Sequence, residues 1–497
     1  MERSSSDQRK LAQRSERVKS VDTEPWILAC LDSGNYQTQA VAADIKSIGA
    51  DYEVKNVDWI SKLPDDVLLL ILSRLSTEEA IRTSVVSKRW KHVWKQMPHL
   101  VFDMQRTIKS KKLRDGSNRV DTLMTKVINN HYGHLESCEI THFSYQGLNG
   151  MLNTWIRSLT CVKHTKVLTL RRYIDIFDRE RKVFCISLDS FSHRSLTSLS
   201  LHSYVLKSSD SLINCSNLRT LKLILIMAPE VGVFNRVLES CPCLEVLVLN
   251  ISCFIKSDGV LKIDNNKLKL LQVSSMEDID GIKVSATSLD ILTFEYTTFE
   301  RDGFFMESPQ LKFNRNFWDS GRYVPHISYN ISKEEKSIGH EELVKISGEL
   351  LRPRFTGSAC LSVSVDLMNR TQVERLRQVL GLWTHKMTVL EIVFKNNSGP
   401  REENESCQKK LWKVNSNEDD AFFPNAKFRV KTVWLYNFSA SEEEFVFASC
   451  LIRQGTVLDT MMVECSSMSY PASKQLKIEA AVAKLQALQW MLAVHCF

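Results

Sequence analysis

A leucine pattern of nearly constant spacing recurs through the middle of this 497-residue chain. Each copy reads Leu-x-x-Leu-x-Leu or a close variant, and the first positions of successive copies are 22, 26, 24, 21 and 22 residues apart. Successive side chains of a strand point to opposite sides, so the second and third leucines share one face. Each unit needs a neighbour to bury that face, which predicts a solenoid of stacked parallel strands. The copies begin at Leu196, Leu218, Leu244, Leu268, Leu289 and, in degenerate form, near Leu311.

A period of about 20 to 29 residues is typical of leucine-rich repeats, in which a short strand alternates with an irregular or helical return. An earlier copy is expected at Val167, Leu168 and Leu170. The residue between the second and third leucines is expected to face outward. These outward positions are mixed in character and indicate no particular ligand: Ser200, Lys222, Val248, Gln272 and Thr293.

The repeat pattern returns near the carboxyl end. Two strands are predicted there, 28 residues apart, over Val430–Leu435 and Leu458–Val463. Between them, Ser441 followed by three glutamates predicts the start of a helix. Elsewhere the pattern predicts helices over Val120–Ile128, Glu341–Leu351, Thr371–Leu382 and Lys474–Met491, strands over Leu361–Val365 and Val389–Phe394, and an exposed loop over Lys395–Asp420.

The segment Val57–Leu100, which precedes the repeats, carries more apolar surface than a stretch of that size can bury alone. Pro64 stands at a first-turn position and predicts the start of one helix. Ser76 and Glu79 have the spacing of a capping box, which predicts a second, short helix. Apolar residues at helical spacing predict a third helix, at Val86, Trp90, Val93, Trp94 and Met97.

Three motifs in this segment resemble an F-box and occur in its order. They are Leu-Pro-Asp-Asp-Val at 63–67, Ile-Leu-Ser-Arg-Leu at 71–75 and Val-Ser-Lys-Arg-Trp at 86–90. The carboxyl end resembles an FBD domain in its Phe-Pro pair at 423–424, its VKTVWLYNF strand and the EEEFVFASCLIRQGTVLDTMMVE block. Nearly all of residues 57–490 therefore resembles plant F-box proteins with leucine-rich repeats and a carboxyl-terminal FBD domain.

The resemblance implies an α/β chain with modules in a fixed order. A small three-helix F-box over 56–103 would be followed by a helical linker over 104–160 and by leucine-rich repeats over 161–330. Degenerate repeats and an exposed loop would fill 331–415, and an FBD domain over 416–497 would continue the repeat. Residues 1–55 are polar and are expected to be disordered.

The resemblance also implies a function, that of a non-catalytic, substrate-recognition subunit of a Skp–cullin–F-box ubiquitin ligase. The F-box would bind the Skp-family adaptor and, through it, the cullin and RING subunits, while the repeats would hold an unknown protein substrate. Two alternatives stay open, an interaction scaffold outside a working ligase and a repeat-based small-molecule receptor. Seven residues are expected either to face the adaptor or to form the F-box core: Leu63, Pro64, Ile71, Leu72, Leu75, Val86 and Trp90.

The helical pattern does not separate the two roles, but Leu63 and Pro64 are the strongest contact candidates because they stand at the exposed start of the first helix.

The remaining sequence argues against other classes of function. It contains no Gly-rich phosphate loop, GxSxG, HExxH or kinase signature, and its 13 cysteines include no CxxC pair, so we expect no active site, cofactor or metal. Basic residues are dispersed among 58 acidic ones, which disfavours nucleic-acid binding. No apolar run is long enough for a membrane span. Free thiols in this number suit a reducing compartment, and nucleus, cytoplasm or both are expected.

Overall fold

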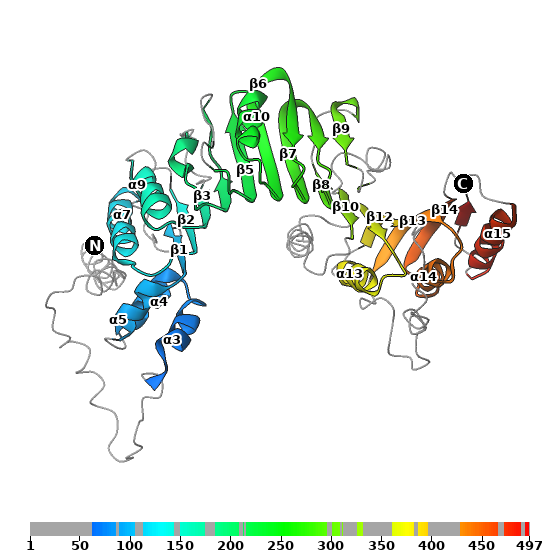
Figure 1. Cartoon of the computed structure of the whole chain (residues 1–497), viewed down its shortest axis with the longest axis horizontal. Helices are drawn as coiled ribbons and strands as arrows, with labels where there is room; N and C mark the ends of the chain where they lie inside the picture. The colour runs from blue at the N-terminus through cyan, green and yellow to red at the C-terminus, as the bar shows by residue number, and fades with distance from the viewer. Residues whose placement is uncertain are drawn as a thin grey trace, which may run out of the picture. The chain divides into compact units, whose positions relative to one another are not determined.

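The computed structural model describes residues 62–85, 89–104, 113–143, 150–173, 184–207, 212, 215–295, 301–308, 311, 326–331, 360–381, 386–395, 428–465, 472–488 and 493–496. The chain divides into two compact units, whose helices and strands are labelled in Figure 1. The first comprises 1–184 with 195–198, and the second comprises 185–194 with 199–497. Helices and mostly parallel strands make up both units, so the predicted α/β class is confirmed.

The first unit begins with three short helices: α3 (Asp65–Leu72), α4 (Thr77–Arg82) and α5 (Trp90–Val93). Short 3-10 turns, η2 (Thr83–Val85) and η3 (Trp94–Gln96), follow α4 and α5. All three predicted helices are thus present. Their shared core is formed by Leu68, Leu72, Ala80, Ile81, Trp90, Val93, Trp94 and Met97, each at most 8% exposed.

The same unit continues into a three-stranded parallel sheet in the order β1 (His99–Asp103), β2 (Ser137–His142) and β3 (Val167–Arg172). The long helix α7 (Leu113–Asn130) connects β1 to β2, and α9 (Met151–Arg157) with the π-turn η4 (Ser158–Val162) leads to β3. The early repeat copy predicted at 167–170 is confirmed by β3. The strands β1 and β2 were not predicted from the sequence, although both alternate buried and accessible residues with the period of a strand.

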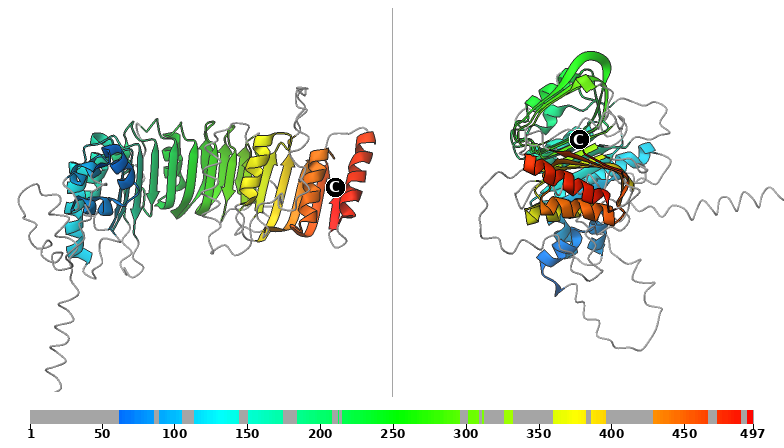
Figure 2. Two further views of the ribbon diagram at one scale, coloured as in Figure 1. Left: turned by 90° about the horizontal axis from the view of Figure 1, so that it is seen from below. Right: turned by 90° about the vertical axis from the view of Figure 1, so that its right-hand side faces the viewer.

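Strands of the second unit carry the leucine pattern. They are β4 (Ser198–His202), which enters this unit at Leu199, β5 (Thr220–Ala228), β6 (Val246–Asp264), β7 (Leu270–Ser285) and β8 (Ile291–Phe294). Consecutive strands are neighbours in the sheet and, from β5 to β8, run parallel in the predicted register. Figure 2 shows them side by side. The second and third pattern residues of these strands are each at most 1% exposed.

The returns between these strands are of two kinds. A helix, α10 (Val231–Glu239), connects β5 to β6. The far halves of β6 and β7 instead continue their parallel pairing beyond a register shift, and β9 (Phe304–Glu307) pairs parallel with the far half of β7. This strand-based return was not predicted. It depends on Gly281, where an added Cβ would lie 2.3 Å from the carbonyl oxygen of Gly303.

Strand direction reverses once in the second unit. The strand β10 (His326–Asn330) pairs antiparallel with β8. From there β11 (Cys360–Val365), β12 (Lys386–Phe394), β13 (Arg429–Phe438), β14 (Val457–Cys465) and β15 (Ala493–Cys496) are parallel to β10 and to one another. The predicted solenoid therefore continues into the carboxyl end, but its later strands point the opposite way.

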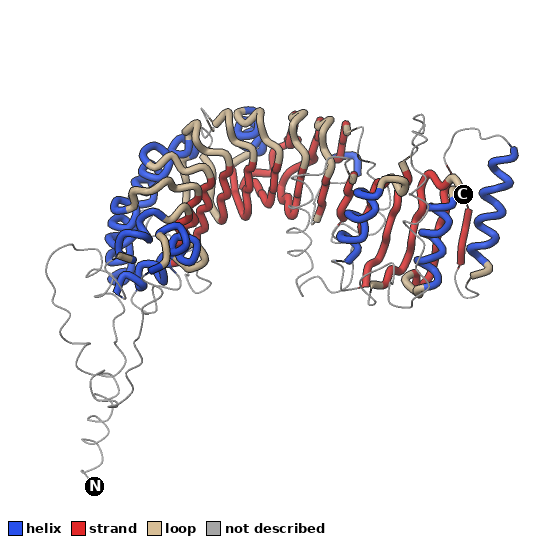
Figure 3. The backbone as a smooth tube through the Cα atoms, turned by 60° about the horizontal axis from the view of Figure 1, so that its bottom comes forward, coloured by secondary structure: helices blue, strands red, loops and turns tan. Residues whose placement is uncertain are grey.

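This reversal moves the covering helices to the other face of the sheet. Strand–helix–strand connections are almost always right-handed, so the face that a helix covers is determined by strand direction. The helices α13 (Arg370–Gly381), α14 (Glu442–Arg453) and α15 (Ala472–Gln486) return the later strands. Figure 1 and Figure 3 show α10 on one side of the sheet and α13 and α14 on the other.

One consequence is that the outward-facing side chains of the repeat strands are mostly buried. Val248, Gln272 and Thr293 lie in register on the face that continues through Ile327 to the helix-covered core. Val248 belongs to the same core cluster as Ile327 and the apolar residues of α13, α14 and α15. The predicted exposure was therefore wrong for four of the five positions: Ser200, Val248, Gln272 and Thr293 are at most 9% exposed.

Further predictions near the carboxyl end agree with the structure. Ser441 caps α14 with a capping box in which Glu444 is the reciprocal partner. The helix predicted from Lys474 is α15, which ends at Gln486 before β15.

Leu311 is buried, and its immediate neighbours lie outside the described residues. Residues 1–55, the predicted helix at 341–351, most of the predicted loop at 395–420 and the Phe-Pro pair at 423–424 also lie outside them.

Two adjacent residues of β13 test which face of the sheet the helices cover. Val433 is fully buried beneath the helices, whereas Thr432 lies half-exposed on the other side of the same strand. Val433→Asp should lower the free energy of unfolding by about 3 kcal/mol or more, because it buries an unpaired carboxylate. Thr432→Asp should lower it by much less. Urea denaturation of both variants measures this difference, and equal losses would contradict the assignment.

Acidification should weaken the first unit through His142. Burial lowers the pKa of this imidazole from 6.5 to about 4, against the raising effect of its hydrogen bond to the Phe143 carbonyl. The unfolded chain then binds more protons between these two pKa values, so stability falls as the pH drops from 6.5 towards 4. Between pH 7.5 and 5 the loss should be about 2 kcal/mol.

His142→Asn should flatten this pH dependence in urea denaturation, whereas His134→Asn, at a side chain 62% exposed, should leave it unchanged. An unaltered slope in the His142 variant would show that another group is responsible.

Candidate partner-docking site on the N-terminal helices

The helix α3 is apolar on two faces. Its sequence DDVLLLIL places six apolar residues in succession, and a helix distributes such a run around its whole circumference. Leu68 and Leu72 are fully buried in the three-helix core. Val67, Leu70 and Ile71, spaced three and four residues apart, are 38%, 61% and 40% exposed. One face of α3 thus holds the small domain together, and the other is left on the surface.

Residues at the start of α3 extend this second face. Pro64, the N-cap residue, is exposed, and Leu63 before it is half-buried. We call the accessible apolar residues of this helix and its start the docking face: Leu63, Pro64, Val67, Leu70 and Ile71. A contiguous apolar surface that a small domain leaves uncovered is typical of a protein–protein contact.

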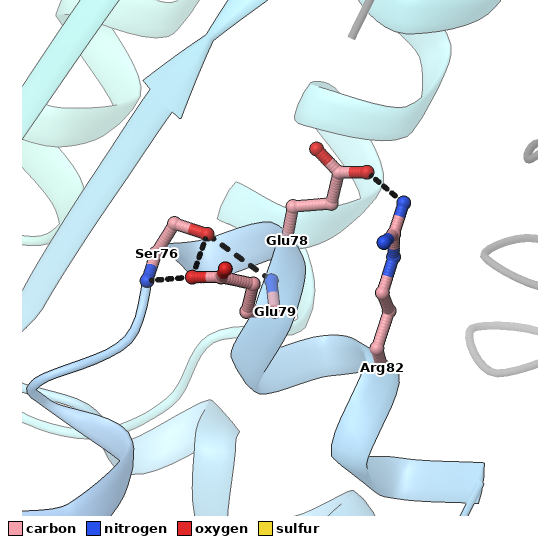
Figure 4. A network of polar contacts seen from close by, with 4 residues as sticks. All are labelled: Ser76, Glu78, Glu79 and Arg82. Atoms are coloured by element: carbon pink, nitrogen blue, oxygen red, sulfur yellow. Dashed lines mark hydrogen bonds and ion pairs between the residues drawn. The ribbon is translucent and has the colours of Figure 1, made fainter. Parts of the chain in front are cut away.

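The second helix is fixed at its start by the predicted capping box (Figure 4). The backbone nitrogen of Glu79 donates to Ser76 Oγ at 3.3 Å, and the backbone nitrogen of Ser76 donates to Glu79 Oε2 at 3.0 Å. The Ser76 hydroxyl donates to the same carboxylate oxygen at 2.7 Å. An ion pair between Arg82 and Glu78, one turn apart, adds a contact along the exposed side of α4. These contacts satisfy donors that the helix end would otherwise leave open.

An ion pair connects the first and third helices. Arg89 Nε donates to Asp65 Oδ1 at 2.7 Å, which joins the residue preceding α5 to the first turn of α3. Because both side chains are more than a third exposed, this pair contributes little to stability, about 1 kcal/mol at most. The buried indoles Trp90 and Trp94 supply the larger share through apolar burial.

The structure describes six of the seven predicted site residues and sorts five of them into an accessible and a buried group. Pro64 and Ile71 are exposed and Leu63 is half-buried, so these three can contact a partner. Leu72 and Trp90 are core residues. Leu75 is half-buried after the end of α3, and Val86 lies outside the described residues.

Sequence reasoning missed two strongly exposed apolar residues. Leu70 is the most accessible residue of the docking face, and Val85 on η2 is 63% exposed. A signal was available for Leu70, because the uninterrupted run from Val67 to Leu72 cannot fit on a single helix face. No comparable signal marks Val85, whose exposure is decided by how η2 packs.

The three helices are fused to the first strands rather than tethered. The Val101 backbone nitrogen donates to Thr77 Oγ1 at 2.7 Å, which connects α4 to β1. The backbone nitrogens of Tyr132 and Gly133 both donate to the Lys95 carbonyl, at 3.0 and 3.2 Å. A Cβ on Gly133 would lie 2.6 Å from the Cα of Gln96, so this close approach requires glycine. The direction of the docking face is therefore set by the sheet of the same unit.

The potentially reactive side chains of the described residues have structural roles. They contain no group of three or more His, Cys, Asp or Glu side chains arranged to hold a metal ion. The nine cysteines whose side chains the structure describes are free thiols, and burial raises the pKa of Cys241 to about 12 and of Cys253 to about 11, which suppresses the nucleophilic thiolate. In the described part of the chain, no helix has the length and apolar character needed to span a membrane.

Comparison with known proteins identifies the three-helix region. The F-box domain family model matches residues 60–102, which contain all three helices and the docking face. The Arabidopsis thaliana F-box protein At1g80960 is 67% identical over 470 residues, covering 93% of this chain and 96% of that protein. The F-box protein At3g60790 from the same plant is 40% identical, covering 96% of this chain and 97% of its own length.

Relatives whose names include further modules are similar over part of the chain. The Arabidopsis thaliana F-box/FBD/LRR-repeat protein At5g44980 is 30% identical over 221 residues, covering 44% of this chain and 47% of that protein. Together with the parallel strands that follow the helices, these matches define the class. The chain belongs to the family of plant F-box proteins, and its relatives include F-box proteins with leucine-rich repeats and an FBD domain. F-box proteins are generally non-catalytic adaptor subunits.

The two faces of α3 should respond differently to truncation. Leu68→Ala should lower the free energy of unfolding by about 2 to 5 kcal/mol, because it leaves a cavity in the three-helix core. Leu70→Ala, two residues away, should change it by about 0.5 kcal/mol or less. Chemical denaturation followed by tryptophan fluorescence reports on both variants, since Trp90 and Trp94 lie in that core. A large loss in the Leu70 variant would show that this side chain is buried within the chain.

Proposed function

We propose that this protein is the substrate-recognition subunit of a Skp–cullin–F-box ubiquitin ligase and that the docking face of α3 binds the Skp-family adaptor. The observation that carries the proposal is the two-faced helix, because Leu70 and its neighbours expose apolar surface that the domain itself does not cover. Full burial of one such side chain contributes about 1.5 to 3 kcal/mol. Covering several of them would hold an adaptor without any covalent link.

The fused joint supports this function mechanically. Because Thr77, Lys95 and Gly133 tie the helices to β1 and α7, an adaptor bound to α3 would hold the strands of the same unit in a defined orientation. A subunit of this kind accelerates ubiquitin transfer by proximity, since it keeps a target lysine near the ubiquitin carried by another enzyme. The chain needs no active site of its own for this role.

The repeats and FBD strands of the second unit are proposed to hold the substrate protein. In that unit the first parts of β6 (246–249) and β7 (270–273) and the whole of β8, β10 and β11 are buried on both faces. Substrate contacts therefore fall on side chains that remain accessible along the returns and edges, such as Phe254, Ile255 and Phe305, which are 47%, 62% and 49% exposed. Apolar side chains of this size are typical anchors of protein interfaces.

A charge placed on the docking face tests adaptor binding. Leu70→Arg should abolish pull-down of the Skp-family adaptor, because the guanidinium would be driven into an apolar contact. Leu476→Arg is a matched control, since Leu476 on α15 is 66% exposed and Leu70 is 61% exposed. Both variants should keep the melting temperature of the parent chain.

Undiminished adaptor capture by the Leu70 variant would contradict the docking assignment. Co-purification of the cullin with the parent chain separates a working ligase subunit from an interaction scaffold, because a scaffold would bring down the adaptor alone.

A further inference from the structure

Two consecutive repeats of the second unit place a thiol and an amine at equivalent positions. In each repeat one residue immediately precedes the first leucine of the pattern, on the turn that leads into the strand. Cys243 has this place before β6, and Lys267 has it before β7. Each lies three residues before one member of the registered pair Val246 and Leu270. The two side chains therefore leave neighbouring turns about one strand spacing apart, about 4.8 Å.

Hydrogen bonds fix these two turns against each other. The backbone nitrogen of Lys267 donates to Asn265 Oδ1 at 2.9 Å, and Asn265 Nδ2 donates across to the Cys241 carbonyl at 3.4 Å. The backbone nitrogen of Lys269 donates to the Glu245 carbonyl at 2.9 Å, where the parallel pairing of the strands begins. The separation of the two side chains is thus set by the sheet and does not depend on a chance approach of two surface loops.

The thiol and the amine are in contact at the surface. Lys267 Nζ donates to Cys243 Sγ at 3.2 Å. Lys267 is exposed and Cys243 is half-buried, so a small reagent can reach both atoms. The repeat positions equivalent to this pair are Ser195, Asn217, Cys243, Lys267 and Ser288, and only the neighbours Cys243 and Lys267 combine a thiol with an amine.

This contact brings together the two atoms of a known type of oxidative bond formation. A thiol that reacts with a peroxide becomes a sulfenic acid, which condenses with a thiol or with a nitrogen atom. Condensation is fast when the nitrogen is already held beside the sulfur, because no second molecule has to be captured. At this surface the nitrogen nearest to the oxidised sulfur would be Lys267 Nζ.

We propose that a hydroperoxide converts Cys243 and Lys267 into a sulfenamide cross-link that joins two consecutive repeats. The Cys243 sulfur first attacks one oxygen of hydrogen peroxide. An S–O bond forms, the O–O bond breaks, and the second oxygen leaves as water with the proton of the thiol. The Lys267 ammonium then releases a proton to solvent and its nitrogen attacks the sulfur. The S–O bond breaks, and the hydroxide takes up a proton and leaves as water.

The sum of these steps balances. One thiol, one amine and one hydrogen peroxide give one sulfenamide and two waters, with the sulfur oxidised by two electrons and the peroxide reduced. A dithiol reductant restores the thiol and the amine and becomes a disulfide. Repeats of this kind are stabilised only by their neighbours, so a covalent bond between two of them should oppose their separation. The cross-link would therefore act as a reversible, redox-sensitive staple in the repeat stack.

Peptide mapping of the full-length chain tests this cross-link. The reduced protein is treated with hydrogen peroxide, digested with trypsin without reductant and analysed by mass spectrometry. The treated sample should contain residues 237–256 joined to residues 263–269, with the mass of the two peptides less two hydrogens, and fragmentation should place the bond at Cys243 and Lys267. Dithiothreitol should release both peptides.

Conservative variants show whether the register directs the reaction. Lys267→Arg keeps the positive charge and a donor beside the sulfur but removes the condensing amine, so the joined peptides should disappear. Lys269→Arg, two residues further on, should leave them unchanged. Cys243→Ser should also abolish the cross-link, whereas Cys241→Ser should retain it because the Cys241 thiol is fully buried.

Thermal unfolding measures the effect on the repeats. Treated parent protein should unfold at a higher temperature than treated Lys267→Arg protein, and dithiothreitol should remove the difference. The exposed thiols Cys161 and Cys185 are present in both samples, so their oxidation does not contribute to it.

Several results would overturn the proposal. One is the lack of joined peptides in the treated parent, and another is their persistence in the Lys267→Arg or the Cys243→Ser variant. A joined pair that carries an additional oxygen would contradict the condensation step. A cross-link that leaves the unfolding temperature at the value of the Lys267→Arg variant would contradict its role as a staple. Adaptor pull-down is a separate measurement on the first unit, so its outcome does not decide this proposal.

Discussion

The fold depends on the burial of one row of leucines across neighbouring strands. Leu221, Leu247, Leu271 and Leu292 stand in register on consecutive strands, and each is at most 1% exposed. No single strand with its return could bury these side chains, so each unit is stable only against the next. That dependence explains why the spacing of the pattern is nearly constant while the returns vary from a helix to a strand.

A second constraint is the handedness of the connections. Because these connections are right-handed, the antiparallel pair β8–β10 transfers the covering helices from one face of the sheet to the other. The register between β8 and β10 shows how the side chains are redistributed between the two faces. Leu292 and Phe294 of β8 are registered with Ser328 and His326 of β10, whereas Thr293 is registered with Ile327 of the helix-covered core. Val248 and Thr293 thereby become buried at positions where an unbroken solenoid would leave an accessible surface.

The F-box, a small domain, gains stability from its own core and from the sheet that follows it. Its three helices share a compact core, and its last residues continue directly into β1, so the domain borrows stability from the sheet. This arrangement leaves one apolar face of α3 uncovered for a partner.

The sequence by itself determined the elements whose signal is local. The leucine spacing predicted the repeat strands, Ser76 with Glu79 and Ser441 predicted two helix starts, and the F-box motifs predicted the family. Only the tertiary structure decided which faces are covered, because burial depends on strand direction and on neighbours far away in the chain. For the same reason Leu72 became a core residue while Ile71, beside it in the same helical pattern, became a surface residue. The three-helix region was thus located from sequence, and packing selected which of its apolar residues are accessible.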